Sequence, residues 1–203
     1  MDQMSFQLMC RLQFMLEPDV LLTICTYNRS SEAEVTEALE PLVSAGASVA
    51  SSPSALAREV DMVISMVSDT PDVRELMLGE SGVCAGARAG LLAIDMSTIL
   101  PAAARKIALD LLACGIDFLD APVSGGESGA IAGALTIMVG GSEAGFARAR
   151  PILECMGRTI THVGESGAGQ VAKAANQILT GVGVLAVAEA LNFAKRHDVD
   201  PAK

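Results

Sequence analysis

The feature that most constrains the fold is a repeated alternation of short apolar runs with segments of helical pattern. The runs rich in aliphatic residues are 20–27, 61–67, 91–95, 116–119 and 135–139. The segments with a helical pattern are 32–45, 53–59, 101–114 and 143–156. Buried strands bounded by helices are typical of a parallel sheet that is covered on both faces. The alternation therefore predicts an α/β fold built on a doubly wound parallel sheet.

The pattern changes near residue 165. From Gln170 to Arg196 there is no proline, and the apolar residues fall on nearly all faces of a helix. Because a helix that is apolar all round is buried between other elements, we expect residues 178–188 to be covered in a soluble protein. We therefore predict one α/β domain over residues 1–164 and the beginning of a helical domain over residues 165–203. Since the chain stops just after a turn-like Asp-Pro pair, we expect this second domain to be incomplete.

Charge and hydropathy argue against two classes of partner. The net charge is −10, whereas a nucleic-acid-binding surface needs basic residues to neutralise phosphates. The apolar run 178–188 is about half as long as the roughly 20 residues that a membrane span needs. The N-terminal segment has no continuous apolar run of the kind found in secretory signals. We expect neither nucleic acid nor a membrane as partner.

The cysteines indicate a reducing compartment. There are five of them, an odd number, widely spaced and without a Cys-x-x-Cys pair. This pattern favours reduced thiols over a disulfide framework or a zinc site. No carboxylate cluster has the spacing of a metal site, and His162 and His197 lie far apart. We predict a cytoplasmic protein that binds no metal, with an organelle as the alternative location.

One glycine-rich stretch could bind an anionic ligand. In DAPVSGGESGAIAGALTIMVGG, which covers residues 120–141, Ser124 stands directly before Gly125 and Gly126. Glycines beside a serine let the backbone approach a ligand closely and offer N–H groups to an anion. The stretch follows a predicted strand, and open α/β sheets bind ligands at the carboxyl ends of their strands. The alternative is a tight turn without a ligand.

A second stretch places a lysine on an apolar helix. In GESGAGQVAKAANQ, residues 164–177, Lys173 is three and four residues from Asn176 and Gln177, so the three share one helical face. A lysine in apolar surroundings is costly unless it has a function or a partner. The alternative is a lysine that extends its ammonium group to solvent.

Together with DMSTILP (residues 95–101), these stretches resemble the β-hydroxyacid dehydrogenase family, which includes 3-hydroxyisobutyrate dehydrogenase, tartronate semialdehyde reductase and the glyoxylate/succinic semialdehyde reductases. The resemblance runs from about residue 20 to the end of the chain and implies a Rossmann-type, NAD(P)-binding domain. It implies that Lys173 is the catalytic proton donor to the substrate carbonyl. The related 6-phosphogluconate dehydrogenases are less similar, because they would usually carry histidine in place of Asn176.

The resemblance also implies roles for other residues. Ser124, Gly125 and Gly126 match the segment that holds the substrate carboxylate, and Asn176 and Gln177 match the amides that orient substrate and lysine. Thr98 matches a position near the nicotinamide and its ribose. Val67 and Ser68 align with a cofactor-contacting Leu-Pro pair, from which this chain departs by lacking the proline.

The cofactor loop is where the chain departs most from the family. Family members open with a strand followed by Gly-x-Gly-x-x-Gly, whose backbone holds the pyrophosphate, whereas the first glycine here is Gly46. We therefore expect weakened dinucleotide binding and an N-terminus that is not the family's own. The segment Asn28-Arg29-Ser30 follows the second strand of the family. Because arginine and serine suit a 2′-phosphate, they favour NADP over NAD, unless Arg29 is merely exposed to solvent.

These observations predict an NAD(P)H-dependent oxidoreductase. Its substrate would be a small carboxylate, either a short semialdehyde or a 2-oxo acid such as glyoxylate or succinic semialdehyde, or a 3-hydroxy acid in the reverse direction. With the complete helical domain we expect a homo-oligomer. The alternative is a catalytically impaired family member that binds no cofactor and acts by association with an intact relative.

Overall fold

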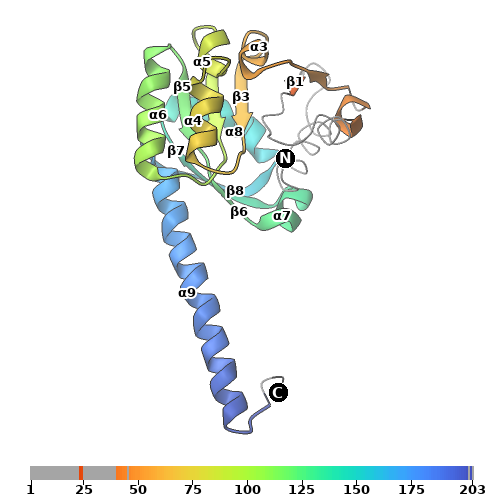
Figure 1. The fold of residues 1–203 in the computed structure, drawn as a ribbon, viewed down its shortest axis with the longest axis vertical. Coiled ribbons are helices and arrows are strands. Elements are labelled where there is room, and N and C mark those ends of the chain that lie inside the picture. Colours follow the sequence, from red (N-terminus) through yellow and green to blue (C-terminus); the bar gives the residue numbers. More distant parts are fainter. Residues whose placement is uncertain (1–22, 25–39, 45, 201, 203) are drawn as a thin grey trace.

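The computed structural model describes residues 23–24, 40–44, 46–200 and 202. Its centre is a six-stranded sheet in the order β3-β4-β5-β7-β6, with β8 paired to β7 (Figure 1). The strands are β3 (Met62–Ser65), β4 (Leu92–Asp95), β5 (Asp117–Asp120), β6 (Val123–Ser124), β7 (Leu135–Gly140) and β8 (Gly157–Gly164). A separate parallel pair joins β1 (Thr23–Ile24) to β2 (Ser48–Val49).

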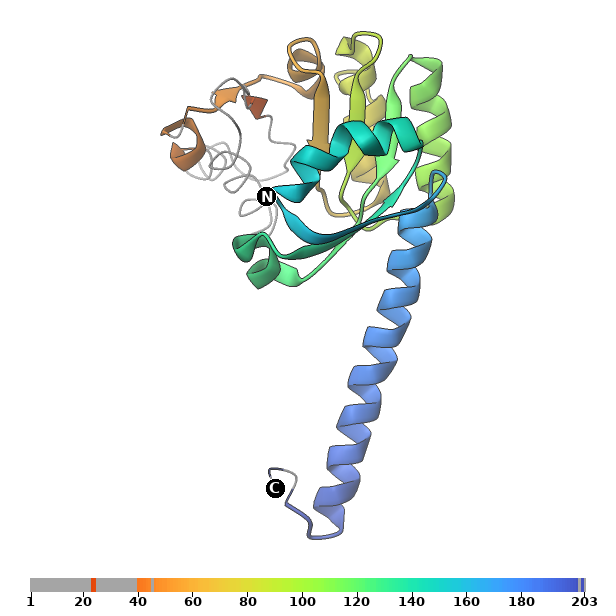
Figure 2. The same ribbon diagram turned by 180° about the vertical axis from the view of Figure 1, so that it is seen from behind.

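Helices cover both faces of the sheet, as the alternation of apolar runs predicts. They are α3 (Pro53–Ala57), α4 (Thr70–Leu78), α5 (Val83–Gly86), α6 (Pro101–Ala113), α7 (Gly126–Ala132), α8 (Glu143–Glu154) and α9 (Ala168–Arg196). One core packs β3, β4 and β5 against α3 to α6, and the other packs β4, β5 and β7 against α8. Figure 1 shows α4 and α6 in front of the sheet, and Figure 2 shows α8 on the opposite face.

The sheet is mixed and not wholly parallel, which corrects one expectation. Strands β3, β4 and β5 run parallel, but β7 is antiparallel to both β5 and β6, and β8 is parallel to β7. A parallel pair needs a long crossover connection. Between β6 and β7 the chain has only the short helix α7, which ends in the left-handed Gly133 at φ 59°. This connection reverses the chain direction.

Most predicted elements that fall on described residues are confirmed. The runs 61–67 and 91–95 contain β3 and β4, and the runs 116–119 and 135–139 overlap β5 and β7. The predicted helices 53–59, 101–114 and 143–156 contain α3, α6 and α8. Only residues 23–24 of the run 20–27, and 40–44 of the segment 32–45, are described; the former form a strand and the latter are helical. The elements α4, α5, α7, β2, β6 and β8 lie outside the predicted runs and helical segments.

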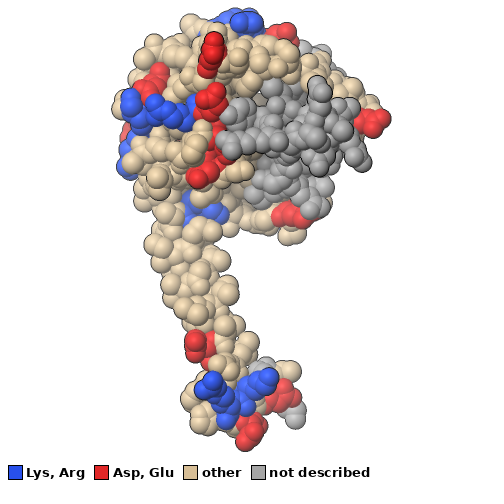
Figure 3. All heavy atoms as spheres, in the orientation of Figure 1, with Lys and Arg blue, Asp and Glu red and all other residues tan. Residues whose placement is uncertain are grey.

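Helix α9 leaves the domain after its first turns, and its exposure corrects a second expectation. The helix has 29 residues, and from residue 178 onward its large apolar side chains are exposed. It carries no charged residue between Lys173 and Glu189. Figure 3 shows this part of the helix as a long stem without charged side chains. By length and composition α9 could cross a membrane, a test that the core helix of a soluble protein also passes. Nothing in the described part of the chain covers residues 178–188.

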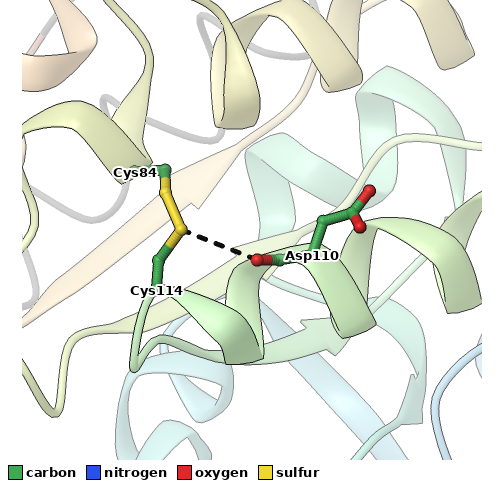
Figure 4. The surroundings of a disulfide bond; sticks show 3 residues. All are labelled: Cys84, Asp110 and Cys114. Carbon is green, nitrogen blue, oxygen red and sulfur yellow. Dashed lines mark hydrogen bonds between the residues drawn. A yellow bond between two sulfur atoms is a disulfide. The ribbon is translucent and has the colours of Figure 1, made fainter.

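A disulfide joins Cys84 of α5 to Cys114 at the end of α6, contrary to the expectation of reduced thiols. Figure 4 shows the bond, with Sγ of Cys114 3.6 Å from the carbonyl oxygen of Asp110. The two cysteines are 30 residues apart, with 6.2 Å between their Cα atoms. They meet because each precedes one of the neighbouring strands β4 and β5. The cysteine pattern therefore no longer supports a reducing compartment.

Candidate active site

The candidate site lies at the carboxyl ends of the three parallel strands. Ser65, Asp95 and Asp120 are the last residues of β3, β4 and β5, and they are paired in register across the sheet. All three are buried. The beginning of α9 packs against the same region, in contact with β5, β7, β8 and α6. This is the sheet edge at which open α/β folds bind ligands.

Asp95 organises the loops that follow β3 and β4. Its Oδ1 accepts hydrogen bonds from the hydroxyls of Ser65, at 2.8 Å, and Ser97, at 2.7 Å. The Ser97 hydroxyl in turn accepts the backbone N–H of Val67 at 2.9 Å. Burial is the main cause that raises the pKa of Asp95 to about 6, with a smaller contribution from the charge of Asp120. Among the described residues, its Oδ2 is a buried side-chain oxygen without a hydrogen-bond partner.

These bonds link the two loops that carry the predicted cofactor-binding residues. Val67 and Ser68 follow β3, and Thr98 follows β4; the bond from Val67 to Ser97 links the two loops. The side chains of Ser68 and Thr98 are exposed, whereas Ser97 and Ile99 on either side of Thr98 are buried. The other predicted cofactor residues, Asn28, Arg29 and Ser30, lie outside the described residues.

Lys173 lies in the second turn of α9 and is only 9 % exposed. No hydrogen bond or ion pair to a described residue accounts for its ammonium group, and burial lowers the pKa of this lysine. A desolvated lysine without a carboxylate partner is suited to donating a proton. Desolvation disfavours its charged form relative to its neutral form, so the ammonium group gives up its proton more readily than it does in water. The helical prediction around Lys173 is confirmed.

The two amides predicted beside Lys173 are less enclosed. Asn176 is half-buried and Gln177 is exposed. Nδ2 of Asn176 donates a hydrogen bond to Oε1 of Gln177 at 3.3 Å. Within the described part of the chain, neither amide is hydrogen-bonded to Lys173. The amide groups therefore face each other at the point where α9 leaves the domain.

The predicted carboxylate-binding turn follows β6. Ser124 is half-buried at the end of this strand, and Gly125 and Gly126 are exposed. The two glycines have φ values of 137° and 59°, a conformation that side chains other than glycine rarely adopt. The turn opens helix α7, which begins at Gly126. Its backbone is thus open to a ligand from the solvent side.

Two site residues lie inside the quoted motifs but were not singled out from the sequence. The Asp120 carboxylate accepts the backbone N–H groups of Gly167 and Gln170, and Gln170 also bonds to the loop after β4 through its side chain. The sequence signal for Asp120 is a carboxylate at the end of an apolar strand, because a buried carboxylate needs hydrogen-bond partners. Within the described residues, no group of three or more histidines, cysteines or carboxylates is arranged to hold a metal.

Two models of known protein families match most of this chain. The family model for the NAD-binding domain of 6-phosphogluconate dehydrogenase covers residues 20–164. A second model, described as the NAD-binding of NADP-dependent 3-hydroxyisobutyrate dehydrogenase, covers residues 167–203. Both models describe NAD-binding segments, so the chain has a fold that binds a nicotinamide cofactor.

Individual relatives agree with the family models. The 3-hydroxyisobutyrate dehydrogenase of Pseudomonas aeruginosa is 48% identical over 161 residues, which are 79% of this chain and 54% of the relative. The 2-hydroxy-3-oxopropionate reductase of Escherichia coli is 46% identical over 143 residues, 70% of this chain and 49% of the relative. The chain spans about half the length of these curated relatives.

A solved structure extends the match to the fold. The structure of Mycobacterium tuberculosis 3-hydroxyisobutyrate dehydrogenase with L-serine has a TM-score of 0.85 and 34% sequence identity, and covers 98% of this chain and 64% of that protein. The sheet, the lysine-bearing helix and the family models that span residues 20–164 and 167–203 lead to one assignment. This chain belongs to the β-hydroxyacid dehydrogenase family.

Proposed function

We propose that this chain provides the active site of an NAD(P)-dependent oxidoreductase that acts on small carboxylates. The favoured direction is reduction of a short semialdehyde or 2-oxo acid such as glyoxylate or succinic semialdehyde, and the reverse is oxidation of a 3-hydroxy acid. The observation that carries the proposal is Lys173, whose side chain is largely buried and whose ammonium group has no partner among the described residues. None of the similar proteins favours the alternative of an impaired relative.

The described residues fit the nicotinamide end of the cofactor. Ser68 and Thr98 are exposed at neighbouring strand ends, and Lys173 follows on the helix that packs against the same sheet edge. When bound, the nicotinamide supplies hydride to the substrate carbonyl carbon. Lys173 stabilises the negative charge that develops on the carbonyl oxygen and gives that oxygen its proton. The Ser124 hydroxyl and the backbone of Gly125 and Gly126 hold the substrate carboxylate.

We expect Ser124→Ala to raise KM for a carboxylate substrate about tenfold, because it removes a hydrogen bond to a charged group. The assay follows NADPH oxidation with glyoxylate and succinic semialdehyde, and acetaldehyde serves as the aldehyde without a carboxylate. Ser81→Ala is the matched control, since Ser81 is an exposed serine outside this turn. Equal turnover of acetaldehyde and the carboxylates by the unsubstituted chain would contradict the proposed substrate class.

The choice of cofactor gives a second prediction. Since arginine forms paired hydrogen bonds with phosphate, we expect NADPH to bind about tenfold more tightly than NADH, and Arg29→Ala to abolish the difference. Nicotinamide fluorescence during a titration measures both affinities, and Arg58→Ala, at an exposed arginine, is the control. Because the chain lacks a glycine loop before Gly46, we expect both affinities to be low. An unchanged preference in Arg29→Ala would rule out this role for Arg29.

A further inference from the structure

The lysine-bearing helix is held to the sheet by one buried carboxylate. Oδ1 of Asp120 accepts the N–H of Gly167 at 2.6 Å, and Oδ2 accepts the N–H of Gln170 at 2.9 Å. Gly167 is the N-cap of α9, so the carboxylate satisfies two of the N–H groups that have no partner within a helix. Its negative charge also lies at the positive end of the helix dipole. Asp120 itself is fully buried.

Gln170 supplies a second attachment, to the loop that follows β4. Its Oε1 accepts the N–H of Ile99 at 3.1 Å, and its Nε2 donates to the carbonyl oxygen of Ser97 at 2.7 Å. Both partners flank Thr98, which is exposed between them. Gln170 is 1 % exposed, so these bonds are shielded from competing water. Helix α9 is therefore fixed at β5 through its backbone and at the loop after β4 through a side chain.

The helix approaches the sheet too closely for any other residue to stand at Gly169. A Cβ atom there would overlap the carbonyl oxygens of Met138 and Asp120. The absence of a side chain lets the helix backbone reach the Asp120 carboxylate. Lys173 lies one turn beyond Gln170, on the same side of the helix. Asp120 is also close in sequence to the substrate-binding turn, because Ser124 follows it by four residues.

We propose that Asp120 and Gln170 form a clamp that positions Lys173 relative to the substrate-binding turn and to Thr98, so that these two residues are positioning residues of the site. Neither needs to touch the reacting atoms. The inference rests on the proposed role of Lys173. Because β5 continues through two residues into β6, displacement of Asp120 would move Ser124 as well as α9. The clamp thus sets the position of Lys173 relative to Ser124, which binds the substrate carboxylate.

Asp117→Asn provides a matched control for Asp120→Asn. Asp117 is on the same strand and also serves a helix start, because its Oδ2 accepts the hydroxyl of Ser142, the N-cap of α8. An asparagine at position 120 keeps the shape of the side chain, but its NH2 group cannot accept the second backbone N–H. We expect the amides of Gly167 and Gln170 to exchange hydrogen about tenfold faster or more in Asp120→Asn than in Asp117→Asn.

Two further measurements separate positioning from general destabilisation. In chain labelled with 13C-methyl groups on lysine, NMR titration should show the pKa of Lys173 moving up toward the ordinary lysine value in Asp120→Asn only. In the reductase assay, kcat should fall by up to about 100-fold, since a misplacement of about 1 Å at a catalytic group can cost that much, with KM for the carboxylate changing less. The amide exchange and the lysine pKa test the clamp even in a chain that proves inactive, so failure of the proposed function stays distinguishable.

Should Asp120→Asn not fold, Gln170→Met carries the same test, because methionine fills the space but cannot bond to Ser97 or Ile99. Unchanged amide exchange and unchanged Lys173 pKa in the folded variant would overturn the inference. Equal changes in Asp117→Asn would also overturn it, since they would show a general loosening of the sheet.

Discussion

Replacing Lys173 with methionine lowers the rate of carbonyl reduction by about 10²- to 10⁴-fold, the usual contribution of a positioned proton donor. The expected effect is on kcat, with cofactor binding retained, because methionine keeps the length and the burial of the side chain. Lys195→Met is the matched control, since Lys195 is exposed at the far end of the same helix. Stopped-flow or steady-state measurement of NADPH oxidation provides the rates.

Two accompanying results distinguish a catalytic lysine from a structural one. Because partial desolvation of an unpaired ammonium group costs free energy, Lys173→Met should leave the unfolding free energy unchanged or higher. Since the ammonium form gives the proton and burial lowers its pKa, reduction should slow as pH rises through a value below that of an ordinary lysine. A Lys173→Met chain that turns over as fast as Lys195→Met would exclude the catalytic role.

The sequence was sufficient for the sheet strands β3, β4, β5 and β7 and for the helix that carries Lys173. These elements have strong local signals: aliphatic runs of strand length, and an apolar helical segment without proline. The resemblance to the family also singled out Ser124 and Lys173, which the structure places at the end of β6 and in the second turn of α9. The helices α4, α5 and α7 are short, and α7 begins at Gly126 directly after Gly125, a pair of glycines that favours a loop.

The long-range polar contacts could not be predicted in this way. The bond from Gly167 to Asp120 spans 47 residues, and the bond from Gln170 to Ser97 spans 73. Such pairs depend on which strands become neighbours, and the order of strands is not encoded in local periodicity. The Cys84–Cys114 disulfide has the same origin, since both cysteines precede adjacent strands. The composition of α9 indicated a helix that needs cover, but composition does not say which part of a protein provides it.

Asp95 makes the stability of the chain depend on pH in a direction opposite to that of most carboxylates. Its pKa is about 6 in the folded chain and 3.8 for an ordinary aspartate, so the folded state binds the proton more tightly than the unfolded state does. Stability from this group is therefore greatest at low pH, falls as pH rises from about 4 to about 6, and stays low above that. The shift corresponds to about 3 kcal/mol. Burial likewise raises the pKa of the neighbouring Asp120, which acts with the same sign.

Asp95→Asn isolates this contribution, because asparagine has the same shape, keeps an acceptor for Ser65 and Ser97, and never ionises. Near pH 4 the two chains should have similar unfolding free energies, since Asp95 is protonated and neutral in the folded state. At pH 7 the variant should be more stable by about 3 kcal/mol, because only the wild-type chain must bury a carboxylate that has an unpaired oxygen. Urea unfolding at both pH values measures the difference. A difference that is the same at pH 4 and pH 7 would mean that folding does not raise the pKa of Asp95.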